Sequence, residues 1–70
     1  MTEKEIELTH AYARLHGSML AIAYIENLEG NTHRAINICQ ALKSSLEKSN
    51  LITKYEWMAE LDAKLADLMK

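Results

Sequence analysis

The chain has 70 residues, a formal net charge of −2, 49% hydrophobic and 26% charged residues, and one cysteine. This composition indicates a single folded domain over residues 1–70 and excludes a disordered chain or an internal disulfide framework. One cysteine favours a reducing compartment, and the charged start lacks a secretory pattern, so we expect a cytoplasmic protein. With no Pro and two Gly to interrupt helices, we predict an all-α fold of three helices.

The first predicted helix runs from the N-terminus to about residue 29. Thr2 and Glu5 match a capping box, and Met1 and Ile6 stand at the hydrophobic-staple positions around it. The stretch 19–25 has no charged residue and is the most apolar part of the chain. It is too short to cross a bilayer, which needs about 20 residues. We therefore expect it to form a buried helical centre.

Apolar residues of this helix recur at spacings of three and four, which predicts one apolar face. The face comprises Leu8, Ala11, Tyr12, Leu15, Met19 and Ile22. From Leu20 a second face opens, with Tyr24 and Leu28. The alternative is a break at Gly17, because Gly inside a helix costs about 1 kcal/mol relative to Ala. No Pro or turn pair accompanies Gly17, so we favour a continuous helix.

The second predicted helix runs from about His33 to Ser49. Gly30 can take the left-handed conformation that ends the first helix, and Asn31 or Thr32 can cap the second. The inner face should contain Ala35, Ile36, Ile38, Cys39, Leu42, Ser45 and Leu46, and the outer face Asn37, Gln40, Ser44 and Lys48. We expect a left-handed Asn50 to end this helix, with Leu51 against Leu46.

The third predicted helix begins at Thr53. Thr53 and Glu56 form a second capping box, and Ile52 and Trp57 stand at its staple positions. The inner face should contain Met58, Leu61, Leu65 and Leu68, and Glu60 and Lys64 should pair on the outside. The staple gives Trp57 a structural role that we prefer to a role at an interface.

The helix lengths predict how the chain stacks and what it leaves uncovered. A short turn makes the second helix antiparallel to the C-terminal half of the first, and the third helix can cover the second face of that half. The N-terminal half of the first helix then lacks cover within the chain. Such a stripe normally has a partner, and a chain this short often needs one. We expect a homodimer with a bundle-like interface or docking on another protein, through Leu8, Ala11, Tyr12, Leu15 and Met19.

Two families share features with the helical hairpin. Glu29-Gly30-Asn31 and Ala35-Ile36 resemble the turn and second helix of one tetratricopeptide repeat, but a single copy cannot build a solenoid. The spacing of Ala13-Arg14, Ser18, Ile38-Cys39 and Leu42 resembles the dimeric helical hairpin that controls plasmid copy number by binding RNA. That resemblance implies dimeric packing. The residues with which that family reads RNA are absent here.

Catalytic and metal-binding patterns are not evident. Glu7 and His10 give one Glu-x-x-His unit, which di-iron bundles use in pairs. The three histidines are expected at the surface or its boundary, and Cys39 is expected to be a small buried hydrophobe. We therefore expect no enzyme, cofactor or metal site, and a small protein-protein interaction module that acts by stoichiometric binding, as an adaptor, accessory subunit or inhibitor.

The alternative function is that of a dimeric nucleic-acid-binding regulator. It would use the basic residues of the second helix, Arg34, Lys43 and Lys48. Neutralising several phosphates requires a basic stripe, and three cations in an acidic chain are few. We therefore expect neither nucleic acid nor membrane as the partner.

Overall fold

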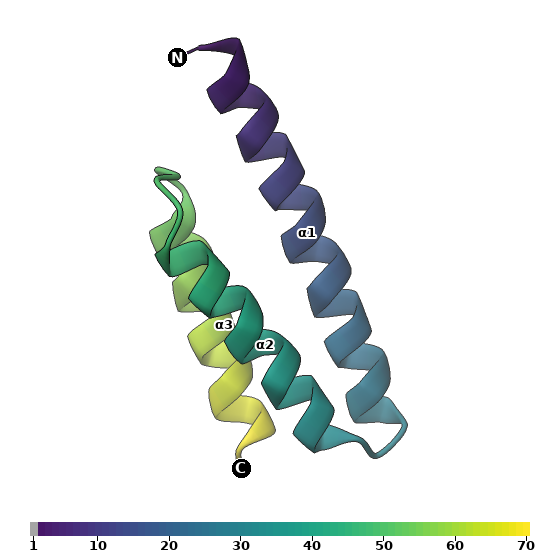
Figure 1. The fold of residues 1–70 in the computed structure, drawn as a ribbon. Helices are drawn as coiled ribbons and strands as arrows, with labels where there is room; N and C mark the ends of the chain where they lie inside the picture. Colours follow the sequence, from purple (N-terminus) through teal and green to yellow (C-terminus); the bar gives the residue numbers. More distant parts are fainter. Residues whose placement is uncertain (1) are drawn as a thin grey trace.

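Three α-helices make up the computed structural model, which describes residues 2–70. They are α1 (Glu3–Leu28), α2 (Thr32–Glu47) and α3 (Lys54–Leu68), and no strand occurs in this range. In the view of Figure 1, α1 runs down, α2 runs up and α3 runs down, and the molecule has an elongated shape measuring 42 × 17 × 14 Å. The predicted all-α, three-helix fold is confirmed for the monomer. Met1, half of the first predicted staple, lies outside the described residues.

The start and the continuity of α1 follow the sequence prediction. The Thr2 hydroxyl accepts a hydrogen bond from the backbone N–H of Glu5 at 3.3 Å, so Thr2 caps the helix. The helix continues through Gly17 without a break. Its 26 residues correspond to a rod of about 39 Å at 1.5 Å per residue, and α1 therefore extends along the whole molecule.

The turn between α1 and α2 is made by Gly30. This residue has φ of +89°, the left-handed conformation that the sequence predicts. Asn31 makes no side-chain hydrogen bond to the start of α2, and the Thr32 hydroxyl donates instead to the amide oxygen of Asn27 at 2.9 Å. The turn is thus fixed by Gly30 and by this bond between side chains, and not by a side-chain cap.

The turn between α2 and α3 differs from the prediction. Gly30 is the only residue of 2–70 with a positive φ, so Asn50 is not left-handed. Ser49 takes the role instead: its hydroxyl donates to the Leu46 carbonyl at 2.7 Å and accepts the Leu51 N–H at 3.5 Å. Because the Ser49 hydroxyl already satisfies the Leu46 carbonyl and the Leu51 N–H, this turn needs no left-handed residue at Asn50.

The predicted capping box and staple of α3 are also wrong. Thr53 precedes α3, but its backbone is already helical, and its buried hydroxyl has no hydrogen-bond partner. Ile52 is 81% exposed and therefore covers nothing. The Trp57 ring stacks on the imidazole of His16 in α1, a contact distant in sequence that replaces the local staple.

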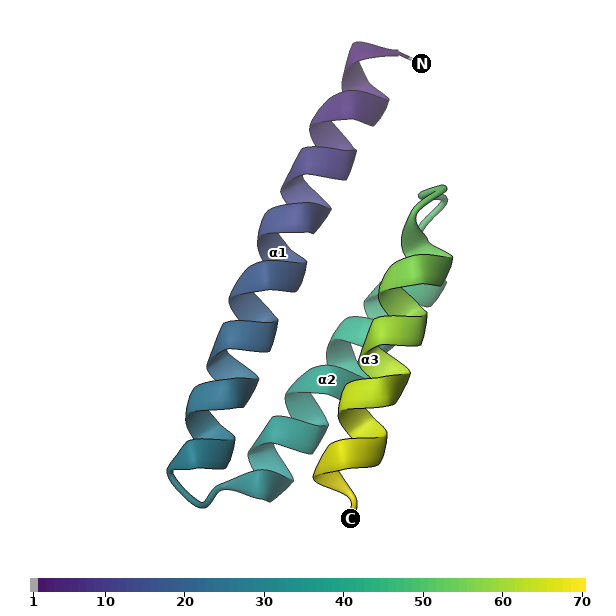
Figure 2. The same ribbon diagram turned by 180° about the vertical axis from the view of Figure 1, so that it is seen from behind.

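The hydrophobic core lies around α2, which packs against both other helices, as the views from the two sides show (Figures 1 and 2). The buried apolar residues are Ala23, Ala35, Cys39, Leu42, Leu46, Leu61 and Leu65. The predicted inner faces of α2 and α3 are therefore confirmed. Because α2 occupies the middle, α3 makes far fewer contacts with α1 than α2 does.

The apolar centre of α1 is less buried than the sequence predicts. Within residues 19–25 only Ala23 is buried, while Ile22, Tyr24 and Ile25 are each at least half exposed. The expectation of a helix covered on two faces is wrong because α3 packs on α2 and leaves the second face of α1 open. The monomer therefore exposes much of the apolar surface of its longest helix.

Candidate protein-binding surface

Exposed residues form a line along α1 that we call the outer stripe: Leu8, Ala11, Leu15, Ser18, Ile22 and Ile25. The spacing alternates between three and four residues, so at 3.6 residues per turn all six lie on one side of the helix. The four large side chains are 40–51% exposed. Isolated exposed apolar residues are ordinary, but a continuous line of them is typical of an interaction site.

The five interface residues predicted from the sequence divide between two sides of α1. Leu8, Ala11 and Leu15 are exposed and belong to the outer stripe. Tyr12 and Met19 are half-buried and pack against the core of this chain. The expectation that Tyr12 lacks cover within the chain is wrong, because Tyr12 packs against the buried core that forms around α2.

A cleft of about 580 Å³ marks the place where the end of α2 reaches the first turns of α1. Leu8, Thr9 and Tyr12 line its α1 side, and residues 48–52 line the other. Leu8 thus faces both this cleft and solvent. Sequence reasoning missed that Ile22 and Ile25 continue the exposed line, although the successive spacings of four and three residues after Ser18 would have revealed it.

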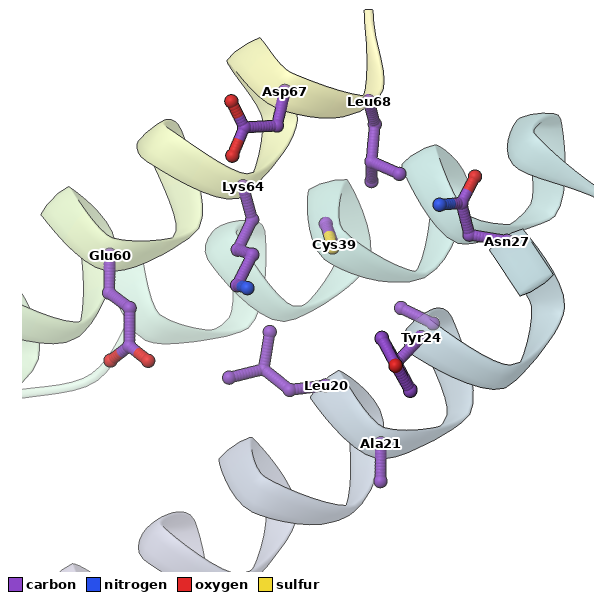
Figure 3. Close-up of a pocket in the computed structure, with 10 residues that line it drawn as sticks. Leu20, Ala21, Tyr24, Asn27, Cys39, Glu60, Lys64, Asp67 and Leu68 are labelled. Atoms are coloured by element: carbon purple, nitrogen blue, oxygen red, sulfur yellow. The ribbon is translucent and has the colours of Figure 1, made fainter.

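A second hollow, a groove of about 550 Å³, separates the C-terminal halves of α1 and α3 (Figure 3). Cys39 of α2 lies between the two helices, Leu20 stands on the α1 side, and Lys64 extends from α3 towards it. The predicted pair of Glu60 with Lys64 is absent, because the Glu60 carboxylate lies 3.3 Å from Nε2 of His16 instead.

His16, Trp57 and Glu60 join α1 to α3 at one point. The rings of His16 and Trp57 stack with centroids 5.1 Å apart and planes inclined by 20°. Since a carboxylate oxygen accepts, Nε2 of His16 donates to Oε2 of Glu60. His16 is only 8% exposed, so the expectation that all three histidines lie at the surface or its boundary is wrong for this residue. His10 and His33 are exposed.

Cys39 is the single thiol of the chain and is 1% exposed, which confirms its predicted place in the core. Burial raises the pKa of the Cys39 thiol above its ordinary value of 9.0, and the positive charge of Lys64 opposes this only in part. The thiol is therefore held in its protonated form, which is a poor nucleophile and a poor metal ligand.

We expect the stability of the fold to decrease as the pH rises above about 9, since the thiol then ionises in the unfolded chain before it ionises in the folded one. The contribution of the neutral thiol is fully present below pH 9.0. Thermal unfolding between about pH 8 and pH 10 should show a steeper fall in Tm for the natural chain than for Cys39→Ala. Equal slopes for the two chains would contradict this account of Cys39.

The basic residues of α2 do not form a common surface. The guanidinium nitrogen Nη1 of Arg34 lies 3.8 Å from the carboxylate oxygen Oε2 of Glu26. The Lys43 ammonium group donates a hydrogen bond to Asp62, which raises the pKa of Lys43. Lys48 is exposed. At about 100° per residue, Lys43 points away from the side of Arg34 and Lys48. The structure therefore adds no support for the nucleic-acid alternative.

Neither a metal cluster nor a membrane-spanning helix is found in the described range. No group of three or more His, Cys, Asp or Glu side chains within residues 2–70 is placed to hold a metal ion. None of α1, α2 and α3 is long and apolar enough to cross a bilayer. Comparisons of the chain with protein-family models, with curated proteins and with solved structures find no match.

Proposed function

We propose that this chain is a small cytoplasmic helical module that acts by stoichiometric binding to protein, as an adaptor, accessory subunit or inhibitor, and that it associates with itself. The outer stripe of α1 carries the proposal. Its four large apolar side chains are 40–51% exposed along a helix that extends the full length of the molecule. Burying apolar surface of this kind in a contact stabilises the complex by about 25 cal/mol for each Å² removed from water.

A role without catalysis agrees with the chemistry of the residues that could react. Cys39 is buried and held as a thiol, and His16 is stacked on Trp57 and bonded to Glu60. Cys39 lines the groove between α1 and α3, but neither side chain is arranged as a nucleophile with a base beside it, as catalysis requires. The proposal therefore includes no cofactor and no metal.

The experiment that tests the proposal is light scattering after size exclusion on the natural chain and on a Leu8→Glu, Leu15→Glu double variant. We expect about twice the chain mass of 8.0 kDa for the natural protein. Each introduced carboxylate would be buried without a partner in a contact, which costs several kcal/mol. The double variant should therefore elute at or near monomer mass.

Circular dichroism separates loss of binding from loss of fold. Since both replaced side chains are exposed in the monomer, the double variant should keep its helix content. A variant that loses helix content together with mass would place Leu8 and Leu15 in the core of the monomer. An unchanged mass, with binding to native-host proteins also unchanged, would show that the outer stripe is not a binding surface.

A further inference from the structure

We propose that the outer stripe of α1 binds the outer stripe of a second copy of this chain, with the two α1 helices antiparallel and Leu8 of each chain facing Ile25 of the other. This inference rests on the proposed function and adds the partner, the orientation and the register. The occupant follows from three features of the stripe: its spacing, the sizes of its side chains and the charges at its ends.

The spacing of the outer stripe favours another α-helix as the occupant. Leu8, Leu15 and Ile22 stand seven residues apart, with Ala11, Ser18 and Ile25 three residues after each. This is the a and d pattern of a coiled coil, in which each side chain inserts between four side chains of a facing helix. The stripe extends over 18 residues, or about 27 Å.

Side-chain sizes determine the orientation. In the antiparallel register, Leu8 faces Ile25, Ala11 faces Ile22 and Leu15 faces Ser18, so each layer contains at least one large side chain and every member of the stripe meets another member. A parallel pair in register would instead place Ala11 on Ala11 and Ser18 on Ser18. Two layers of small residues leave voids, and voids in a contact are destabilising.

The charges beyond the stripe favour the same orientation. Lys4 and Glu29 continue the alternating spacing at the two ends of α1, and both are exposed. In the antiparallel register, Lys4 of one chain meets Glu29 of the other at each end of the contact. A parallel pair would place Lys4 against Lys4 and Glu29 against Glu29, and like charges at such positions weaken pairing.

The rest of the monomer leaves room for this contact. The outer stripe lies roughly a third of a turn around α1 from Tyr12 and Ala23, which pack on the core, and from His16, which contacts α3. The second copy therefore approaches α1 from a side that α2 and α3 leave exposed, and only its N-terminal end, at Leu8, adjoins residues 48–52. The residues that hold the monomer together are not needed for the dimer.

Cysteine cross-linking tests the orientation. The variants are Leu8→Cys and Ile25→Cys, each made in the natural chain, whose Cys39 is buried and serves as the unreactive control. A disulfide needs Cα atoms within about 7 Å. In the antiparallel dimer the two copies of residue 8 are about 25 Å apart, whereas residue 8 of one chain adjoins residue 25 of the other.

We expect oxidation of an equal mixture of the two variants to give a covalent dimer of twice 8.0 kDa that joins one variant to the other, while each variant alone stays monomeric on a denaturing gel. Covalent dimers formed by each variant alone would show a parallel pair and overturn the inference. No covalent dimer from any sample would overturn it as well. The Leu8→Glu, Leu15→Glu variant then separates the two proposals. If light scattering gives it a monomer mass, or if it no longer binds a partner, only the orientation is wrong and the proposed function stands.

Discussion

Replacing Leu42 with alanine should cost about 2–5 kcal/mol of unfolding free energy, which is as much as a domain of this size is expected to have. Leu42 is fully buried at the centre of α2, the helix that contacts both α1 and α3. The substitution removes buried methyl groups and leaves a cavity, and three short helices offer little further structure to fill it. Urea titration followed by circular dichroism should show the Leu42→Ala chain largely unfolded without denaturant.

Leu28→Ala is the matched control for this prediction. It removes the same atoms from a leucine that is 68% exposed near the end of α1, so its effect should lie within about 0.5 kcal/mol of zero. Similar unfolding midpoints for the two variants would mean that the core is not centred on α2.

The second large effect is expected from introducing glutamate at two adjacent positions of α1. Ala23 is 4% exposed and faces α2, so Ala23→Glu should unfold the chain, because a buried unpaired carboxylate costs several kcal/mol. Ile22 is 50% exposed in the outer stripe, so Ile22→Glu should keep the monomer folded and weaken self-association at least about tenfold, which corresponds to 1.4 kcal/mol.

Circular dichroism and light scattering together distinguish the two variants. Ile22→Glu should retain helical signal with a monomer mass, and Ala23→Glu should lose helical signal. The sequence pattern predicts the opposite outcome for Ile22, which it places in the core, so this comparison also tests the orientation of α1. An Ile22→Glu chain that unfolds would mean that the outer stripe is internal.

Local signals in the sequence determined the secondary structure and most of the core. The Thr2 cap, the left-handed Gly30 and the inner faces of α2 and α3 depend on residues within a few positions of one another. Spacings of three and four on α2 also place Cys39 among the buried residues. These features need no knowledge of how the helices pack.

Local signals gave wrong results where a distant residue competed for the same group. The staple of Ile52 and Trp57 does not form, because the Trp57 ring stacks on His16 and Ile52 is exposed. Glu60 bonds to His16 for the same reason, although Lys64 stands one turn away. Such exchanges depend on which helices become neighbours, and spacing along the chain cannot show that.

The residue pattern along the chain is therefore sufficient to predict three helices joined at Gly30 and near Ser49, with an apolar first helix too long for its neighbours to cover. Which side of α1 faces inward depends on how the helices pack. Apolar residues surround much of this helix, so its pattern supports more than one inward face. Because α2 lies between α1 and α3, it covers Tyr12, Met19 and Ala23 and leaves Leu8, Leu15 and Ile22 exposed.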